Sequence, residues 1–325
     1  MKNAFVKEKS AEFLEFMKSG AGMLIFAMML GNIINFLFNS YIGRKLSLED
    51  LGLVTLINTL WYLAGIFING IASTTNYKTA YLSTKESGKT TVNFWKATLR
   101  LVIIIASVVS VLWLFSIPFF DTFFHINSLM ILTIFTPVIL LGVVTAVNKG
   151  FIQGNLMFGW IAVITVVEAL SKLLIAAFLI SLGLYQWVFT AIPISIFLTG
   201  LVALFYSRKL SASLYNLSDS IGPAHSFPGY FYAASVASSV SSIIFLSVDI
   251  ILVKHYFNPT IAGTYALLSL VGKMIYFFGA LPAVFMITFV SRAEGQGKST
   301  RNTFYIILIV TLLLTFCGFL GLGIL

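Results

Sequence analysis

The chain has 325 residues, of which 59% are hydrophobic and only 10% are charged. Soluble domains carry about 25% charged residues, so this composition excludes a soluble globular protein and places most of the chain in lipid. A net charge of +9 would suggest nucleic-acid binding in a soluble chain. In a membrane protein it reports topology instead, so we expect no nucleic-acid partner.

Nine apolar runs have the roughly 20 residues that a membrane-spanning helix needs. In chain order they cover residues 20–41, 53–72, 101–120, 129–147, 156–182, 187–206, 231–252, 262–290 and 302–325. The first run is too long for a signal-peptide core, so we expect it to be retained. Gly183 follows the fifth run and predicts a helix end and a short hairpin turn over 183–186. The fold class predicted is an all-α polytopic membrane protein with about nine transmembrane helices.

Lys and Arg are distributed unevenly among the segments that connect these runs. Alternate segments, counted from the N-terminus, carry fifteen of them, and the other segments carry three. Because cytoplasmic loops are enriched in Lys and Arg, the N-terminus is predicted to be cytoplasmic. The segments 73–100, 148–155 and 291–301 would then be cytoplasmic loops.

Residues 207–230 form the one long polar connector in the middle of the chain. Leu210, Leu214, Leu217 and Ile221 recur at helical spacing, which predicts a short amphipathic helix on the cytoplasmic surface. We take this connector as the boundary between a six-helix lobe over 1–206 and a second lobe that begins at 231 and covers 231–325.

The second lobe repeats the first at an offset of 211 residues. The segment 35–53 then aligns with 246–264, so that Gly52 meets Gly263, and both segments contain a polar corner between two helices. Six helices separate the copies, which predicts a parallel repeat, a common architecture of membrane transporters. The chain reaches only three helices into the second copy, so we expect a fragment of a longer protein. A complete nine-helix protein is the alternative.

Four ionisable residues lie within the apolar runs, where a charge requires a partner or an aqueous cavity. Glu168 and Lys172 are one turn apart on one helix face, which is consistent with a self-neutralising pair or with a charged spot in a cavity. Asp249, near a helix end, could bind a coupling ion or cap the corner. Lys273 lies deeper and would suit a phosphate-bearing substrate.

Asparagines add polarity to the first two helices. Asn32, Asn35 and Asn39 share one helix face, and Asn58 and Asn69 lie on the next helix. A polar stripe in lipid must face protein or water, so these side chains either join helices by hydrogen bonds or line a cavity. The three histidines lie in separate loops, so neither a metal site nor a cofactor is expected.

Three parts of the sequence resemble a known family of membrane proteins. They are the first hairpin over 35–53, the later hairpin with Asp249, Ala262-Gly263-Thr264-Tyr265 and Lys273, and the link from Lys149-Gly150 to Glu168 and Lys172. The chain resembles the polysaccharide-export or oligosaccharide-flippase branch of the superfamily that also holds multidrug extruders and lipid II flippases. The resemblance implies two six-helix lobes around a central cavity lined by helices 1, 2, 7 and 8, and transport of lipid-linked oligosaccharide by alternating access.

The resemblance leads to a specific expectation of function. The protein would be a flippase of the cytoplasmic (inner) membrane that moves undecaprenyl-diphosphate-linked glycans for cell-surface polysaccharide or lipopolysaccharide biosynthesis, alongside other glycan-assembly membrane proteins. Lys172 and Lys273 would contact the phosphates, Asp249 and Glu168 would couple ions or balance charge, and Asn35, Asn39 and Asn58 would make the cavity polar.

One alternative is a cation-coupled multidrug exporter, which would favour an acidic cavity. Another is a membrane-embedded glycan polymerase or acyltransferase, but no predicted external loop is large enough for a catalytic site, so we expect no enzyme.

Overall fold

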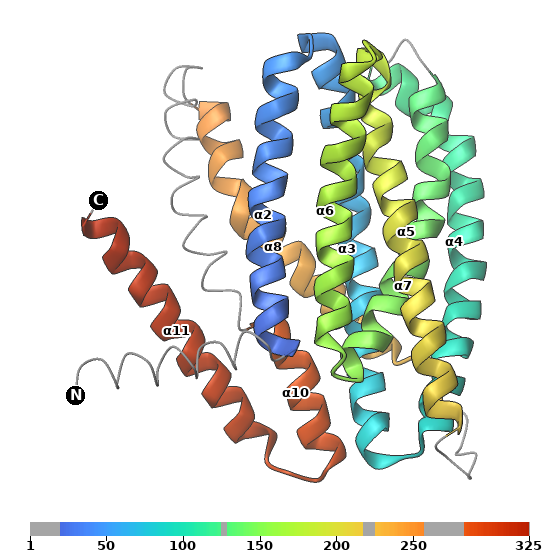
Figure 1. Ribbon diagram of the computed structural model, residues 1–325, viewed down its shortest axis with the longest axis vertical. Coiled ribbons are helices and arrows are strands. Elements are labelled where there is room, and N and C mark those ends of the chain that lie inside the picture. Colours follow the sequence, from blue (N-terminus) through green and yellow to red (C-terminus); the bar gives the residue numbers. More distant parts are fainter. Residues whose placement is uncertain (1–19, 125–128, 217–224, 257–282, 325) are drawn as a thin grey trace.

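The computed structural model describes residues 20–124, 129–216, 225–256 and 283–324, and these ranges are helical apart from short turns. Six long helices and one short 3-10 helix stand side by side in an upright bundle (Figure 1). They are α2 (Gly20–Lys45), α3 (Leu48–Lys85), α4 (Gly88–Phe124), α5 (Leu129–Gly154), α6 (Phe158–Ser181), η1 (Tyr185–Thr190) and α7 (Ala191–Asn216). Three more helices follow, namely α8 (Gly229–Tyr256), α10 (Ala283–Gly295) and α11 (Thr300–Ile324).

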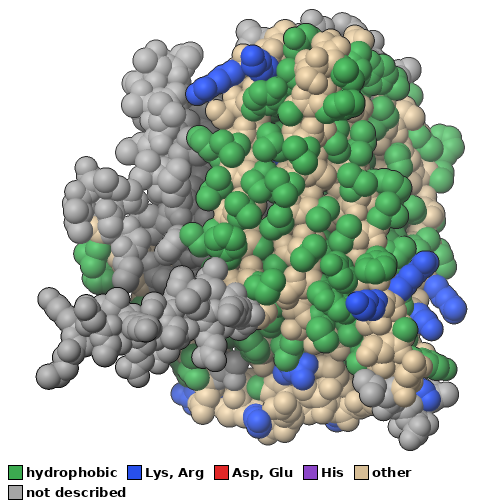
Figure 2. Space-filling view, viewed as in Figure 1, with side chains coloured by type: hydrophobic (Ala, Val, Ile, Leu, Met, Phe, Trp, Pro, Cys, Tyr) green, Lys and Arg blue, Asp and Glu red, His purple; other side chains and the backbone are tan. Residues whose placement is uncertain are grey.

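Six of the described helical segments are long and apolar enough to cross a membrane. They cover Gly22–Lys45, Asp50–Lys85, Gly88–Phe120, Leu132–Gly154, Phe158–Ser181 and Tyr185–Asn216. Large apolar side chains such as Phe115 and Phe119 are 79% and 67% exposed on the outside of the bundle. Figure 2 shows hydrophobic side chains covering most of this face. Such a surface is stable only against lipid, so the prediction of an all-α polytopic membrane protein is confirmed.

The predicted loop over 73–100 is largely helix. Helices α3 and α4 continue through it and leave only a turn at Glu86 and Ser87. Polar residues extend these helices because their side chains find partners on the helix itself: the hydroxyl of Thr74 donates to the carbonyl of Gly70 at 2.7 Å, and that of Thr75 to Ile71 at 2.8 Å. Reading these polar residues as loop was therefore wrong.

Two other connectors are also shorter than predicted. Helix α5 continues to Gly154, so Lys149 belongs to a helix and not to a loop over 148–155. Helix α7 continues to Asn216, so Leu210 and Leu214 form its last turns, and Leu210 is buried. Leu217 and Ile221 lie outside the described residues, and the division into two lobes stays a prediction.

The turn after α6 follows the sequence closely. Gly183 has a φ of +74°, the left-handed conformation that glycine adopts most readily at a helix end. The chain then enters η1 and continues directly into α7. The predicted helix end and hairpin turn are confirmed.

Helix α3 is the element around which the others are arranged. It packs extensively against α5 within the bundle, and also against α8 and α10 from the predicted second lobe. Helix α2 packs mainly on α6, and α11 leaves the bundle obliquely after α10 (Figure 1). Helix α3 therefore contacts both the six-helix bundle and the described helices of the predicted second lobe.

Candidate transport cavity

A cavity of about 890 Å³ lies where α3, α5, α6, α7 and α8 meet. Its lining consists of Thr59, Trp61, Tyr62, Leu63, Gly65, Ile66, Ile68, Asn69, Ala72, Gly142, Thr145, Ala146, Lys149, Glu168, Ile196, Thr199, Ser238, Ser239 and Ser242. The volume is in the range of sites that bind small molecules. The serines come from α8, so the cavity lies between the six-helix bundle and the predicted second lobe.

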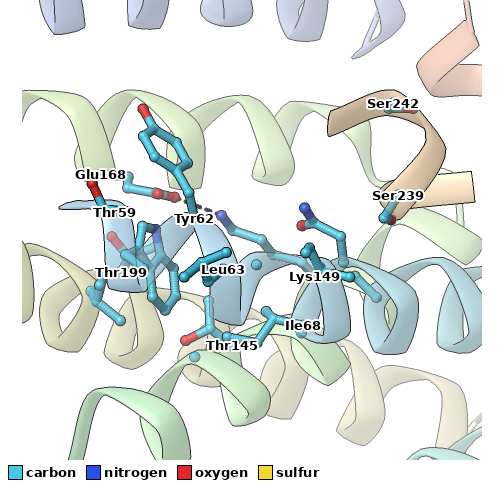
Figure 3. A pocket seen from close by; sticks show the side chains of 18 of the residues that line it. Thr59, Tyr62, Leu63, Ile68, Thr145, Lys149, Glu168, Thr199, Ser239 and Ser242 are labelled. Atoms are coloured by element: carbon cyan, nitrogen blue, oxygen red, sulfur yellow. Dashed lines mark hydrogen bonds and ion pairs between the residues drawn. The ribbon is translucent and has the colours of Figure 1, made fainter. Parts of the chain in front are cut away.

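Neutral hydrogen-bonding groups dominate the polar part of this lining. They are Thr59, Asn69, Thr145, Thr199, Ser238, Ser239 and Ser242. Figure 3 shows Ser239 and Ser242 on one side of the cavity and Thr59 and Thr199 on the other. The uncharged remainder of the lining is apolar or small and includes two aromatic residues, Trp61 and Tyr62, of which Tyr62 is 65% exposed. Hydroxyl, amide and aromatic groups together can bind a polar, uncharged molecule from several sides.

One ion pair provides the charge in the described lining. The ammonium of Lys149 on α5 donates to Glu168 Oε2 on α6 at 2.7 Å (Figure 3). The two side chains remain 29% and 36% exposed. Since both line the cavity, the pair is accessible from the cavity and contributes no net charge to it.

Glu168 therefore pairs with a different lysine from the one expected. The i, i+4 neighbour Lys172 is on the same helix, but its ammonium lies 4.9 Å from the centre of the Phe38 ring on α2. Lys149 on the facing helix α5 can bring its ammonium end-on to the Glu168 carboxylate, whereas the side chains of Glu168 and Lys172, one turn apart on α6, lie side by side. Lys172 is not among the described residues that line the cavity, although Glu168 is.

The asparagines of α2 lie elsewhere. The side-chain amide of Asn39 donates to the backbone carbonyl of Asn35 on the same helix at 2.9 Å. Neither residue is among the described cavity-lining residues, and Asn58 of α3 is half-buried outside them as well, next to the lining residue Thr59. Asn69 does line the cavity. The structure thus brings one of these asparagines to the cavity, and cavity roles for Asn35, Asn39 and Asn58 stay predictions.

The remaining two charged candidates are not brought to the cavity by the described residues. Asp249 is half-buried in the second half of α8, beyond the serines that face the cavity. Lys273 lies outside the described residues. The described lining carries no net charge, and phosphate contacts by Lys172 and Lys273 stay predictions.

The sequence-based prediction missed Lys149 as a site residue. It was counted as a loop cation because it falls in the segment 148–155, between the apolar runs 129–147 and 156–182. The available signal is weak: Phe151 and Ile152 continue the apolar pattern after Lys149, and in the structure Val147 and Phe151 are both fully buried. A lysine between two buried residues must face a carboxylate or water.

Searches for family models and for curated proteins found no match. Solved structures do match. A multidrug resistance MATE family transporter of the MOP superfamily in an outward-facing conformation superposes with a TM-score of 0.68, at 16% identity, over 93% of this chain and 70% of that one. This chain has a MATE-like transporter fold.

Two further structures with this fold differ in source. A MOP superfamily transporter from Pyrococcus furiosus, described as having a binding pocket of reverse polarity that suggests a different function, matches with a TM-score of 0.68 at 13% identity. A eukaryotic MATE transporter matches with a TM-score of 0.63 at 14% identity. Each match covers 93% of this chain and 70% of the other. The MATE-like fold agrees with the superfamily named from the sequence, and the polysaccharide-export branch stays a prediction.

Proposed function

We propose that this protein is an exporter that moves a lipid-linked glycan across the cytoplasmic membrane by alternating access, with its N-terminus in the cytoplasm. The observation that carries the proposal is the composition of the cavity. Its described lining has no net charge and combines seven neutral hydrogen-bonding residues and two aromatic residues with apolar or small side chains such as Leu63, Ile66 and Ile196. Sugars offer many hydroxyl groups and an apolar ring face, which such a lining can match by hydrogen bonds and by aromatic contacts.

The MATE-like fold supports the transport part of this proposal and argues against an enzyme. The substrate expected from the sequence is an oligosaccharide linked to undecaprenyl diphosphate, and its assembly would involve other membrane proteins of glycan synthesis. Such a substrate needs a polar cavity for the glycan, while its lipid tail stays in the bilayer.

A multidrug exporter is the second candidate, because one structure with this fold is described as a multidrug resistance transporter. A cationic drug would be attracted by an uncompensated carboxylate, whereas Glu168 is neutralised by Lys149 at 2.7 Å. The charge of the cavity therefore favours the glycan over the cationic drug.

Transport by the reconstituted protein tests the proposal. Proteoliposomes are loaded with a fluorescent undecaprenyl-diphosphate-linked oligosaccharide, and its movement between leaflets is followed by quenching from outside. We expect translocation to be about fivefold slower in Tyr62→Ala, because the exposed ring can contribute roughly 1 kcal/mol of stacking to a bound sugar. Tyr215→Ala is the control, since Tyr215 is 45% exposed on α7 away from the described lining. Efflux of a cationic dye without glycan movement would contradict the proposal.

A further inference from the structure

The ion pair in the cavity is placed where a substrate anion could displace one of its members. Lys149 is on α5 and Glu168 on α6, and their 2.7 Å contact lies on the cavity wall. With 29% of its side chain exposed, the Lys149 ammonium can use a further N–H donor toward the cavity. The carboxylate therefore occupies a position on the ammonium that a phosphate oxygen would also favour.

Displacing Glu168 would leave its carboxylate, which is only 36% exposed, without a counter-ion between membrane helices, and this is costly unless another cation accepts it. Lys172 is such a cation. It lies one helical turn after Glu168 on the same face of α6, and its charge acts on the Glu168 carboxylate alongside that of Lys149. The Lys172 ammonium itself lies over the Phe38 ring at 4.9 Å, a contact that is weaker than an ion pair with a carboxylate.

We propose that Lys149 binds a phosphate oxygen of a diphosphate group and that Glu168 then transfers its ion pair from Lys149 to Lys172. This inference rests on the proposed function and identifies the subsite for the diphosphate that joins lipid and glycan. Before substrate binds, the described lining carries no net charge because Glu168 forms an ion pair with Lys149. The loaded cavity gains one lysine for the substrate, while Lys172 leaves the Phe38 ring and neutralises Glu168.

Binding of inorganic diphosphate to the purified protein, measured by titration calorimetry, tests the subsite. Glu168→Gln should tighten binding about tenfold, because the neutral amide competes less for Lys149. The double variant Lys149→Gln/Glu168→Gln removes both charges of the pair and leaves Lys172 over the Phe38 ring, so it should fold and lose binding. Lys209→Gln, a change on the exposed surface of α7, is the control and should bind as the wild type does. Binding that is unchanged in the double variant would overturn the subsite.

The transfer of the ion pair has its own test. Lys172→Gln alone should weaken diphosphate binding about tenfold, because Glu168 then has no second cation. In the Glu168→Gln background the same change should have no effect. Equal weakening in both backgrounds would mean that Lys172 contacts the phosphate directly, and it would overturn the transfer.

The outcome can be separated from that of the proposed function. If binding depends on Lys149 but cationic dyes are exported and glycan lipid is not, the subsite stands and the proposed function fails. If glycan lipid is translocated while diphosphate binding does not depend on Lys149, the proposed function stands and the subsite fails. Displacement of diphosphate by phosphatidylglycerol at equal concentration would identify a general headgroup site and reject the specificity for diphosphate.

Discussion

Two glycines of α5 determine how closely this helix approaches α3. A Cβ atom on Gly150 would lie 2.5 Å from the Ala72 carbonyl oxygen, and one on Gly154 would lie 2.6 Å from the Thr79 Cβ. Backbone atoms cannot move aside at low cost, so the contact requires glycine. The close approach places Lys149, the neighbour of Gly150, beside the cavity wall formed by α3.

Gly150→Ala should therefore destabilise the bundle. Overpacking of a well-packed interior typically costs about 1–3 kcal/mol, and the Gly150 position has backbone atoms on the opposing side. The measurement is the thermal unfolding midpoint in detergent, which should fall. Gly159→Ala on α6 is the matched control, because its nearest neighbour would be the flexible Met23 side chain at 3.8 Å. Equal midpoints for the two variants would refute the close contact as a source of stability.

At the scale of elements, α10 packs against the end of α3 that is predicted to be cytoplasmic. The hydroxyl of Thr288 donates to Asn76 Oδ1 at 3.0 Å, and both residues are buried. The Gln153 amide of α5 donates to the Val284 carbonyl at 3.1 Å. Figure 1 shows α10 at the same end of the bundle as the turn between α3 and α4. These contacts join segments far apart in sequence and hold this end together.

Arg292 and His225 add three more side-chain contacts at the same end. The Arg292 guanidinium donates to Ser83 Oγ at 2.9 Å and to the Gly154 carbonyl at 3.4 Å. The His225 ring lies 2.8 Å from Glu86 in the turn between α3 and α4. A transporter that opens alternately must break such contacts to expose its cavity to the cytoplasm.

Arg292→Ala should make this end open more often. Loss of hydrogen bonds from a charged donor is worth about 1.5–3 kcal/mol, so the open population should rise roughly tenfold or more. The reporter is Ser291→Cys at a buried position of α10, in a Cys317→Ser background. The readout is the rate at which this cysteine reacts with a membrane-impermeant maleimide in inside-out vesicles. Lys298→Ala, on the exposed turn before α11, is the control. An unchanged rate in Arg292→Ala would show that Arg292 does not hold this end closed.

For the whole molecule, the distribution of charge sets the expected orientation. Placing Lys149 in the cavity leaves fourteen Lys and Arg residues on one side against three on the other. Figure 2 shows most Lys and Arg side chains of this face in its lower half and one group at the top. The bias remains large, so the N-terminus is still expected in the cytoplasm.

Cysteine labelling of intact cells checks this orientation. Gln186 is exposed in η1 and Gln296 is exposed in the turn between α10 and α11. In a Cys317→Ser background, Gln186→Cys should react with an impermeant maleimide from outside, and Gln296→Cys should react only after the membrane is opened. The opposite pattern would invert the proposed direction of transport.

The sequence by itself determined the features that depend on local chemistry. Apolar runs require lipid and helices because an unsatisfied backbone in lipid is too costly, so the polytopic helical class followed directly. Of the nine predicted spans, the first six correspond to membrane-length helices among the described residues. Gly183 ended α6 as predicted, since its turn is formed by neighbouring residues. Helix ends were less predictable, because Thr74 and Thr75 satisfy their hydroxyl groups within the helix and extend it beyond the apolar run.

Only the tertiary structure decided which distant residues meet. Glu168 has one lysine a single turn away on its own helix and another 19 residues earlier on a facing helix, and the geometry of α5 against α6 selected the second. Ser235, Ser238, Ser239 and Ser242 recur at helical spacing on α8, which marks a polar helix face but not what that face meets, and the packing places the last three on the cavity. Spacing along a sequence reports neighbours on one helix, whereas a cavity is lined by residues from several helices whose contacts depend on the packing of the whole chain.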